Sequence, residues 1–301
     1  MTSEDMTPPG SDRGLLGYTG HLMKRAFLHV HAHGADAMPI GRHPREIGVL
    51  LLLIHAGPLS QARVGALLDI SRTDMVKVVD GLETPGYVVR ERDPADRRRY
   101  ALRATEAGER ACEELRAAAD EAERAAFACL SADERARLVP ILLDLIPDLR
   151  DALPAELLAR TGFLIARCHH RLRRRGEQRL ASRGLRPRHF GLLTALASAE
   201  PCSQQRLAGL MGVSGPAIIQ SIDELERAGV IRRDRNPDDR REHLLLITPD
   251  GRRRHREARD DMDDFQRELV IEIGAERIAE LNRLLLALIP SEAPTPQRRT
   301  P

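Results

Sequence analysis

The chain has 301 residues, enough for one large domain or two of ordinary size. Hydrophobic residues make up 42% and charged residues 31%, which is typical of a globular protein. The net charge is only +2, so the chain does not coat nucleic acid through overall positive charge, although a local basic surface remains possible. Aromatic residues are only 3%, so no stacking platform for single-stranded nucleic acid is expected.

The cysteines and the apolar runs exclude further classes of protein. Cys112, Cys129, Cys168 and Cys202 form no CxxC pair and no zinc-finger spacing, and the chain is too long and cysteine-poor for a disulfide-stapled scaffold. The acidic N-terminus is unlike a signal peptide, and the longest apolar runs are too short to cross a bilayer. We therefore expect a cytoplasmic protein that does not associate with membranes.

An internal repeat determines the predicted domain organisation. Ser60–Gly108 and Ser203–Gly251 align without a gap at an offset of 143 residues, with 18 identities in 49 positions, and the register continues beyond both ends. We therefore predict two copies of one domain. The predicted domains span residues 12–147 and 155–290, with disordered tails at 1–11 and 291–301.

Each copy is predicted to contain the same elements in the same order. The helices of the first copy are expected at 13–33, 44–55, 60–68, 71–83, 105–129 and 132–146. Those of the second copy are expected at 155–182, 187–199, 203–211, 214–226, 248–273 and 275–289. Strands are expected at 87–92 and 100–104, and at 230–235 and 243–247.

Local signals set several of these boundaries. Gly34 and Pro39 are expected to end the first helix earlier in the first copy than in the second. Hydroxyl side chains are expected to cap the third, fourth and fifth helices: Ser60, Ser71 and Thr105 in the first copy, and Ser203, Ser214 and Thr248 in the second.

Two helices joined by a tight turn and followed by a β-hairpin describe a winged helix-turn-helix. The predicted fold is therefore mainly α with small β-wings, in two tandem winged helix-turn-helix domains. The last helix of each copy carries an apolar stripe: Leu138, Ile141, Leu142 and Leu145, and Leu281, Leu284, Leu285 and Leu288. Each stripe packs within its own domain or against the other stripe across a pseudo-two-fold axis, and the matching surfaces favour the second arrangement.

The hairpins carry a motif that suggests a family. The first copy has Asp96-Arg97-Arg98, Leu102, Thr105 and Gly108, and the second has Asp239-Arg240-Arg241, Leu245, Thr248 and Gly251. In this combination the sequence resembles the MarR family of bacterial transcription regulators. The resemblance implies a dimer whose two winged lobes each read half of a palindrome in double-stranded operator DNA, normally as a repressor.

Because one chain carries both copies, the resemblance implies a monomeric, intramolecular pseudo-dimer. It also implies a small, aromatic effector, bound between the dimer helices and the DNA-binding lobe, that releases the DNA. The effector-pocket candidates are Tyr18, Phe27, Phe163, His169 and Phe190. Since Phe190 stands where the first copy has Ile47, the two pockets differ, and one strong effector site per chain is expected.

The fourth helix of each copy is expected to enter the major groove. Its apolar positions face the core: Met75, Val79 and Leu82, and Ile218, Ile222 and Leu225. The opposite face is expected to contact DNA through Arg72, Thr73, Val76 and Lys77, and through Ser214, Ile219 and Gln220. The wing candidates are Arg97, Arg98, Arg99, Arg240 and Arg241. The alternatives are a solvated helix face and, for Arg98 and Arg241, structural ion pairs.

Other chemistry has less support. The run His29-Val-His31-Ala-His33 places two histidines on one helix face without a further ligand, so no metal site is expected. Cys168 has basic neighbours, which leaves open a redox role beside an inert one. The chain has no phosphate-binding loop or nucleophile elbow, so neither a cofactor nor an enzymatic activity is expected. The alternative function is a ligand-binding or enzymatic protein of the same fold that has lost DNA binding.

Overall fold

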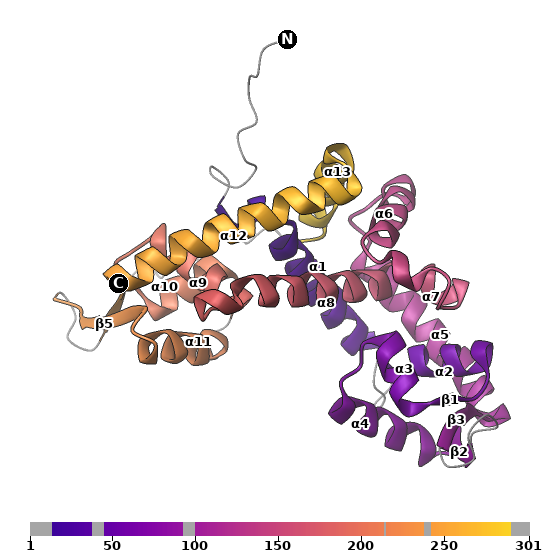
Figure 1. Ribbon diagram of the computed structural model, residues 1–301. Helices are drawn as coiled ribbons and strands as arrows, with labels where there is room; N and C mark the ends of the chain where they lie inside the picture. Colours follow the sequence, from indigo (N-terminus) through magenta and orange to yellow (C-terminus); the bar gives the residue numbers. More distant parts are fainter. Residues whose placement is uncertain (1–13, 38–44, 93–99, 214, 238–241, 290–301) are drawn as a thin grey trace, which may run out of the picture. The chain divides into compact units, whose positions relative to one another are not determined.

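The structure is a computed structural model that describes residues 14–37, 45–92, 100–213, 215–237 and 242–289 (Figure 1). The described residues form a mainly helical protein with small antiparallel sheets, which confirms the predicted fold class. None of the helices in these ranges is long and apolar enough to span a bilayer.

The first copy follows the predicted order of elements. Its elements are η1 (Gly14–Gly17), α1 (Thr19–Ala37), α2 (Arg45–Ala56), β1 (Leu59–Ser60), α3 (Gln61–Leu68), α4 (Arg72–Glu83), β2 (Val88–Arg92), β3 (Tyr100–Ala104), α5 (Glu106–Ala126), α6 (Ala132–Asp144) and η2 (Pro147–Leu149). The second copy repeats them as α7 (Ala155–Leu158), α8 (Thr161–Leu180), η3 (Ala181–Arg183), α9 (Pro187–Ala197), β4 (Cys202–Ser203), α10 (Gln204–Met211), α11 (Gly215–Arg227), β5 (Ile231–Arg235), β6 (His243–Ile247), α12 (Pro249–Ile273) and α13 (Ala275–Leu288).

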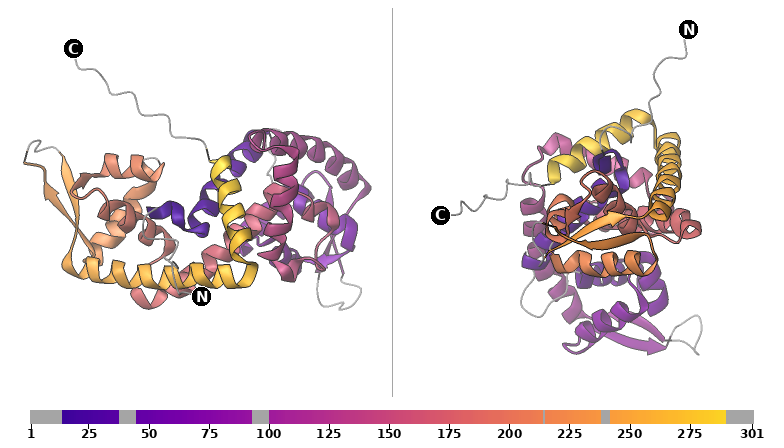
Figure 2. Two further views of the ribbon diagram at one scale, coloured as in Figure 1. Left: turned by 90° about the horizontal axis from the view of Figure 1, so that it is seen from above. Right: turned by 90° about the vertical axis from the view of Figure 1, so that its left-hand side faces the viewer.

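Each copy forms a three-stranded antiparallel sheet rather than the predicted two-stranded hairpin. The strand order is β1-β3-β2 in the first copy and β4-β6-β5 in the second, where β5 and β6 lie side by side (Figure 2). Leu59 pairs with Leu102, and Cys202 pairs with Leu245. The additional strands are only two residues long, which is too short for the alternation of apolar and polar residues that predicts a strand.

The predicted caps are present wherever the structure describes them. Each hydroxyl accepts a hydrogen bond from the backbone N–H three residues further on: Ser60, Ser71, Thr105, Ser203 and Thr248. Ser214 lies outside the described residues. The prediction that the first helix ends earlier in the first copy is wrong at Gly34, because α1 continues to Ala37, which aligns with Leu180, the last residue of α8. Pro39 lies outside the described residues. A glycine costs a helix only about 1 kcal/mol, which neighbouring contacts can offset.

The chain divides into two compact units, and each unit contains segments of both copies. Unit 1 comprises Leu172–Ile278 together with the described residues up to Leu22. Unit 2 comprises Met23–Arg171 and Ala279–Ile289. The winged helix-turn-helix elements of the second copy therefore lie in unit 1, and those of the first copy lie in unit 2.

The two units contain the same contact with the roles of the copies exchanged. In unit 1, the backbone N–H of Thr19 donates to Gln266 Oε1 at 3.1 Å. In unit 2, the backbone N–H of Gly162 donates to Glu123 Oε1 at 3.2 Å. Thr19 aligns with Gly162 in the repeat, and Glu123 aligns with Gln266. The start of each copy's first long helix therefore packs on the long fifth helix of the other copy.

Unit 2 also contains both apolar stripes. All eight residues of the stripes on α6 and α13 are buried. Arg137 Nε lies 3.0 Å from Glu280 Oε1, and these two positions align in the repeat. A contact between aligned positions is what two-fold packing of repeated segments produces. A second ion pair joins Arg283 and Glu134 at 3.0 Å. These contacts support the arrangement in which the stripes of the two copies meet.

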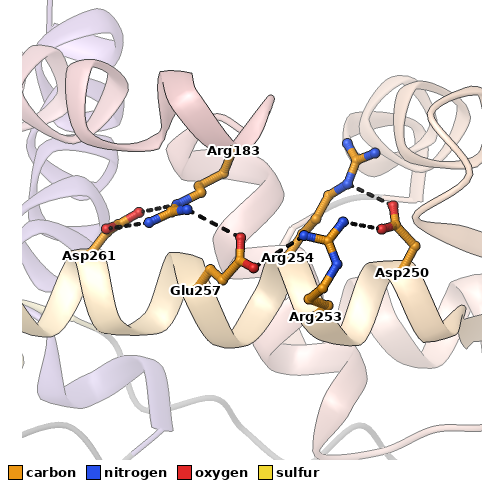
Figure 3. Close-up of polar contacts among 6 residues, drawn as sticks. All are labelled: Arg183, Asp250, Arg253, Arg254, Glu257 and Asp261. Carbon is orange, nitrogen blue, oxygen red and sulfur yellow. Dashed lines mark hydrogen bonds and ion pairs between the residues drawn. The ribbon is translucent and has the colours of Figure 1, made fainter.

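A series of ion pairs reinforces α12 within unit 1. Arg183, at the end of η3, lies 2.7 Å from Asp261 and 3.2 Å from Glu257 (Figure 3). Further along, Arg175 on α8 pairs with Glu272 at 2.5 Å and stacks over the ring of Phe265. Arginine forks that bind two carboxylates hold a geometry more firmly than single surface pairs do.

Candidate nucleic-acid interface and internal cavity

The outer face of α4 presents the four predicted DNA-contacting side chains together. Arg72, Thr73, Val76 and Lys77 are exposed, and the exposed fraction of Val76 is 44%. On the opposite face, Met75, Val79 and Leu82 are buried as predicted. Among the described residues, neither Arg72 nor Lys77 has a hydrogen-bond or ion-pair partner, so both cationic groups are available to an external ligand.

The first turn of α4 is held by a polar network. The Ser71 hydroxyl donates to Asp74 Oδ2 at 2.9 Å, and Arg45 on α2 lies 3.1 Å from the same carboxylate. The Ser71 hydrogen bond, followed by the charge of Arg45, lowers the pKa of Asp74. Asp74 therefore stays ionised and links α4 to α2. No sequence motif singles out Arg45, because only the fold brings it beside α4.

The corresponding face of α11 is exposed but carries no cation in its first turns. Ile219 is 41% exposed, and the exposed Gln220 donates from Nε2 to Glu224 Oε1 at 2.9 Å. Glu224 also accepts hydrogen bonds from Arg188 at 2.6 Å and His189 at 2.8 Å, and these bonds lower its pKa to about 2. The side-chain amide of Gln220, the predicted base contact of the second copy, is thus hydrogen-bonded to the ionised Glu224 carboxylate.

The tips of both wings lie outside the described residues. This holds for the wing candidates Arg97, Arg98, Arg99, Arg240 and Arg241. The structure shows the strands from which the first tip extends. Arg92 at the end of β2 stacks over the ring of Tyr100 at the start of β3, with 4.6 Å between the guanidinium carbon and the ring centroid.

One arginine of each hairpin pairs with the recognition helix. Arg90 lies 3.1 Å from Glu83 of α4. The aligned Arg233 lies 2.6 Å from Asp223 of α11 and also pairs with Glu226. The same ion pair therefore recurs in both copies and fixes the wing strand to the recognition helix. The basic character of the hairpin is in part structural.

The Thr-x-x-Gly motif has a direct structural explanation. The Thr248 hydroxyl donates to Gly229 O at 2.7 Å and accepts from the backbone N–H of Gly251. A Cβ atom at Gly251 would lie 2.0 Å from Val230 O, so only glycine permits this close approach of α12 to the sheet. Gly108 has the same role in the first copy, where a Cβ would lie 2.2 Å from Tyr87 O.

Unit 2 contains a cavity of about 220 Å³ between its winged lobe and its long helices. The walls come from α1, α2, α5, α7, α8 and the end of α3. Phe27, Phe127 and Phe163 supply aromatic surface. Arg167 and His170, both on α8, supply polar groups on one wall. The site therefore combines an apolar interior with a cationic edge at Arg167, and the carboxylates of Asp69 and Glu123 also line it.

Similarity to known proteins identifies the family that carries this geometry. Residues 40–99 and 185–243 each match the MarR family. The HTH-type transcriptional regulator YkoM of Bacillus subtilis is 33% identical over 122 residues, which cover 40% of this chain and 79% of YkoM. The chain belongs to the MarR family. It is a regulator of that family with two fused copies of the domain in one chain.

Other similar proteins each match less than half of this chain. The putative transcriptional regulatory protein for the hcr operon of Thauera aromatica is 35% identical over 102 residues, covering 34% of this chain but only 61% of that protein. The repressor CouR bound to a 23-mer DNA duplex is 26% identical, with a TM-score of 0.41 and coverage of 42% of this chain and 90% of CouR. A mutant of Escherichia coli MarR complexed with operator DNA is 24% identical, with a TM-score of 0.41 and coverage of 43% and 93%.

In this MarR-family chain, the five predicted effector-pocket residues lie in different places. Phe27 and Phe163 line the cavity of unit 2. His169 stacks on Phe27, with 4.6 Å between the ring centroids. Tyr18 and Phe190 lie in unit 1, where their rings meet edge to face at 5.4 Å.

Bulky side chains occupy the positions in unit 1 that correspond to the cavity wall. Ala119 and Ala122 of the cavity align with Met262 and Phe265, and both of these are buried. Ile47 aligns with Phe190, which is 4% exposed. The two copies of this MarR-family chain therefore differ in side-chain volume at these three positions.

The cysteine and histidine candidates also have defined surroundings. Cys168 is fully buried, its thiol donates to Leu142 O at 3.2 Å, and burial raises its pKa. The neutral thiol is therefore favoured, which supports the inert interpretation. His29 Nε2 lies 2.9 Å from Ala126 O, and His33 Nδ1 lies 2.9 Å from His29 O. Backbone carbonyls thus occupy one nitrogen of each of these two rings.

Proposed function

We propose that this MarR-family chain binds a single, imperfectly palindromic DNA operator in the cytoplasm and represses transcription until a small effector releases it. The observation on which this proposal rests is the pair of recognition helices, α4 and α11, each with a buried apolar face and an exposed outer face. Two such helices in one molecule read half-sites about one helical turn apart.

The two half-sites should differ in sequence. Lys77 and Arg72 suit guanine edges or phosphates, whereas Gln220 suits adenine. The exposed Val76 and Ile219 suit thymine methyl groups, and Thr73 and Ser214 suit phosphates. Selection of bound duplexes from a random pool tests this assignment. A perfectly symmetric selected site would contradict it, and tight binding of small molecules without any DNA binding would favour the alternative function.

One chain is proposed to form the whole DNA-binding unit, with domains at 12–147 and 155–290. The contacts of Thr19 with Gln266 and of Gly162 with Glu123 support this, because in each of them one copy packs the start of its first long helix on the fifth helix of the other copy. In a dimer of single-copy chains, this contact would join two separate chains. Light scattering of the protein–operator complex should give one chain per minimal operator. An obligatory second chain would contradict the pseudo-dimer.

The wing arginines are proposed to enter the minor groove. Arg97→Ala and Arg240→Ala should weaken binding to all sequences and reduce the salt dependence of log K by about one unit for each phosphate contact that the substitution removes. Arg173→Ala is the control, because Arg173 is an exposed arginine of α8, outside the winged helix-turn-helix elements, and its guanidinium pairs with Glu177 at 2.7 Å. Equal salt slopes for wild type and both tip variants would place the tips away from DNA.

The cavity of unit 2 is proposed as the single effector site. Its phenylalanines suit an aromatic ring, and Arg167 and His170 suit an acidic substituent. The aligned positions of unit 1 are filled by Phe190, Met262 and Phe265, so one site per chain is expected. Calorimetry with a panel of aromatic acids tests the stoichiometry, and two equal sites would contradict the proposal.

A further inference from the structure

Asp69 occupies a backbone position that favours glycine. It is the C-cap of α3, with φ at 54° and ψ at 44°, in the left-handed region. The aligned residue of the second copy is Gly212, which has nearly the same conformation, with φ at 61°. An aspartate in this conformation is strained relative to glycine. The backbone is nearly the same in the two copies, so the difference between them at this position is the Asp69 side chain.

The Asp69 side chain lies in the wall of the cavity and faces the cationic edge. Its Oδ2 accepts a hydrogen bond from His170 Nδ1 at 2.8 Å and lies 3.7 Å from Arg167 Nη1. Arg167 is only 8% exposed, so water screens little of the attraction between its guanidinium and the Asp69 carboxylate. The carboxylate therefore occupies the side of Arg167 and His170 at which an acidic ligand would bind.

Asp69 also connects this contact to the recognition helix. Only Ile70 separates it from Ser71, the N-cap of α4. Ile70 is itself buried and lines the same cavity. Arg167 and His170 belong to α8 of the other copy. The Asp69 contacts are thus a short mechanical link between a scaffold helix and the start of the helix that reads DNA.

We propose that Asp69 is an internal competitor for the effector. An aromatic monocarboxylate in the cavity would take the place of the Asp69 carboxylate on Arg167 and His170 and repel it, which frees the start of α4. Arg167 thereby keeps an anionic partner when the ligand takes the place of Asp69. This inference rests on the proposed effector function and specifies how occupancy of the cavity is transmitted to α4.

The test replaces Asp69 with glycine, the residue that the second copy has at the aligned position, Gly212. Asp69→Gly removes the competing carboxylate. The relief of backbone strain raises stability and the loss of the contacts with Arg167 and His170 lowers it, so a thermal melt first checks that the variant is folded. Benzoate, salicylate and 4-hydroxybenzoate are the probes, with benzamide as the neutral analogue. By calorimetry, Asp69→Gly should bind at least one carboxylate about tenfold more tightly than wild type, with no gain for benzamide. Asp69→Asn, which keeps the shape but not the charge, should show a similar gain.

The control is Glu123→Gln. Glu123 also lines the cavity, but it accepts from Gly162 N and contacts Arg160 rather than Arg167 or His170. Glutamine is the residue of the second copy at this position. If Glu123→Gln gains as much affinity for the carboxylate probes as Asp69→Gly does, the gain comes from removing any negative charge near the cavity, and the proposal that Asp69 competes with the ligand is wrong.

DNA binding gives the second readout. Without any probe, Asp69→Gly should bind the selected operator as weakly as wild type does when it is saturated with the probe. Adding the probe to Asp69→Gly should change the affinity of this variant for the operator by less than about twofold. Unchanged probe affinity in both Asp69 variants, or no binding by any of the carboxylates, overturns the inference. A wild type that binds probes but no DNA sequence instead refutes the proposed regulator function, because the calorimetric comparison needs no DNA.

Discussion

Filling the cavity with the side chain that the second copy carries should abolish effector binding without loss of DNA binding. Ala122 is 8% exposed and lies in the cavity wall, and the aligned Phe265 is 3% exposed. Ala122→Phe therefore places a ring in this cavity of about 220 Å³. The reciprocal change, Phe265→Ala, removes the ring from unit 1.

The magnitudes follow from the area that the ring buries. A phenyl ring buries roughly 100 Å² more apolar surface than a methyl group, worth at most about 2.5 kcal/mol at 25 cal/mol per Å². After some loss to side-chain ordering, Ala122→Phe should be about 1–2 kcal/mol more stable than wild type. Phe265→Ala should cost about 3–5 kcal/mol, because it leaves a cavity and removes the stacking partner of Arg175.

Urea unfolding, calorimetry with aromatic acids and anisotropy with operator DNA measure the three quantities separately. Ala122→Phe should retain wild-type operator affinity and show no heat of binding with any acid that binds wild type. Wild-type effector affinity in Ala122→Phe would refute the assignment of the cavity. A loss of stability in this variant would show that the cavity walls cannot accept the ring.

Three further changes test the remaining parts of the structure. Lys77→Ala should weaken operator binding more than Gln220→Ala, by about 1–3 kcal/mol for each base contact removed, in a titration against each half-site, and equal effects would contradict the asymmetry. Gly251→Ala should lower the thermal midpoint sharply because its Cβ would meet Val230 O, whereas Gly209→Ala, at an open helical position, should raise stability by up to about 1 kcal/mol. Burial, followed by the charge of Arg259, lowers the pKa of His255 to about 4, so the unfolded state binds more protons between pH 6.5 and 4. The free energy of unfolding should therefore fall as the pH is lowered across that range, and His255→Gln should reduce the fall.

Most of the elements and their buried faces could be predicted from the amino-acid sequence alone. The 143-residue repeat, the hydroxyl caps and the apolar spacing on α4 and α11 all depend on residues close together in the chain. Local hydrogen bonds and a 3.6-residue period are sufficient to predict such features. The same local signals failed at Gly34, where the helix propensity of one residue was outweighed by its surroundings.

The contacts between these elements could not be predicted in the same way. The ion pairs of Arg90 and Arg233 with the recognition helices, and the contact of Asp69 with His170, depend on how separate elements pack against one another. The sequence showed that Phe190 replaces Ile47, but not that the space remains open in unit 2. Whether this space is open or filled depends on how side chains from several helices pack together, and the spacing of apolar residues along a single helix does not predict that packing.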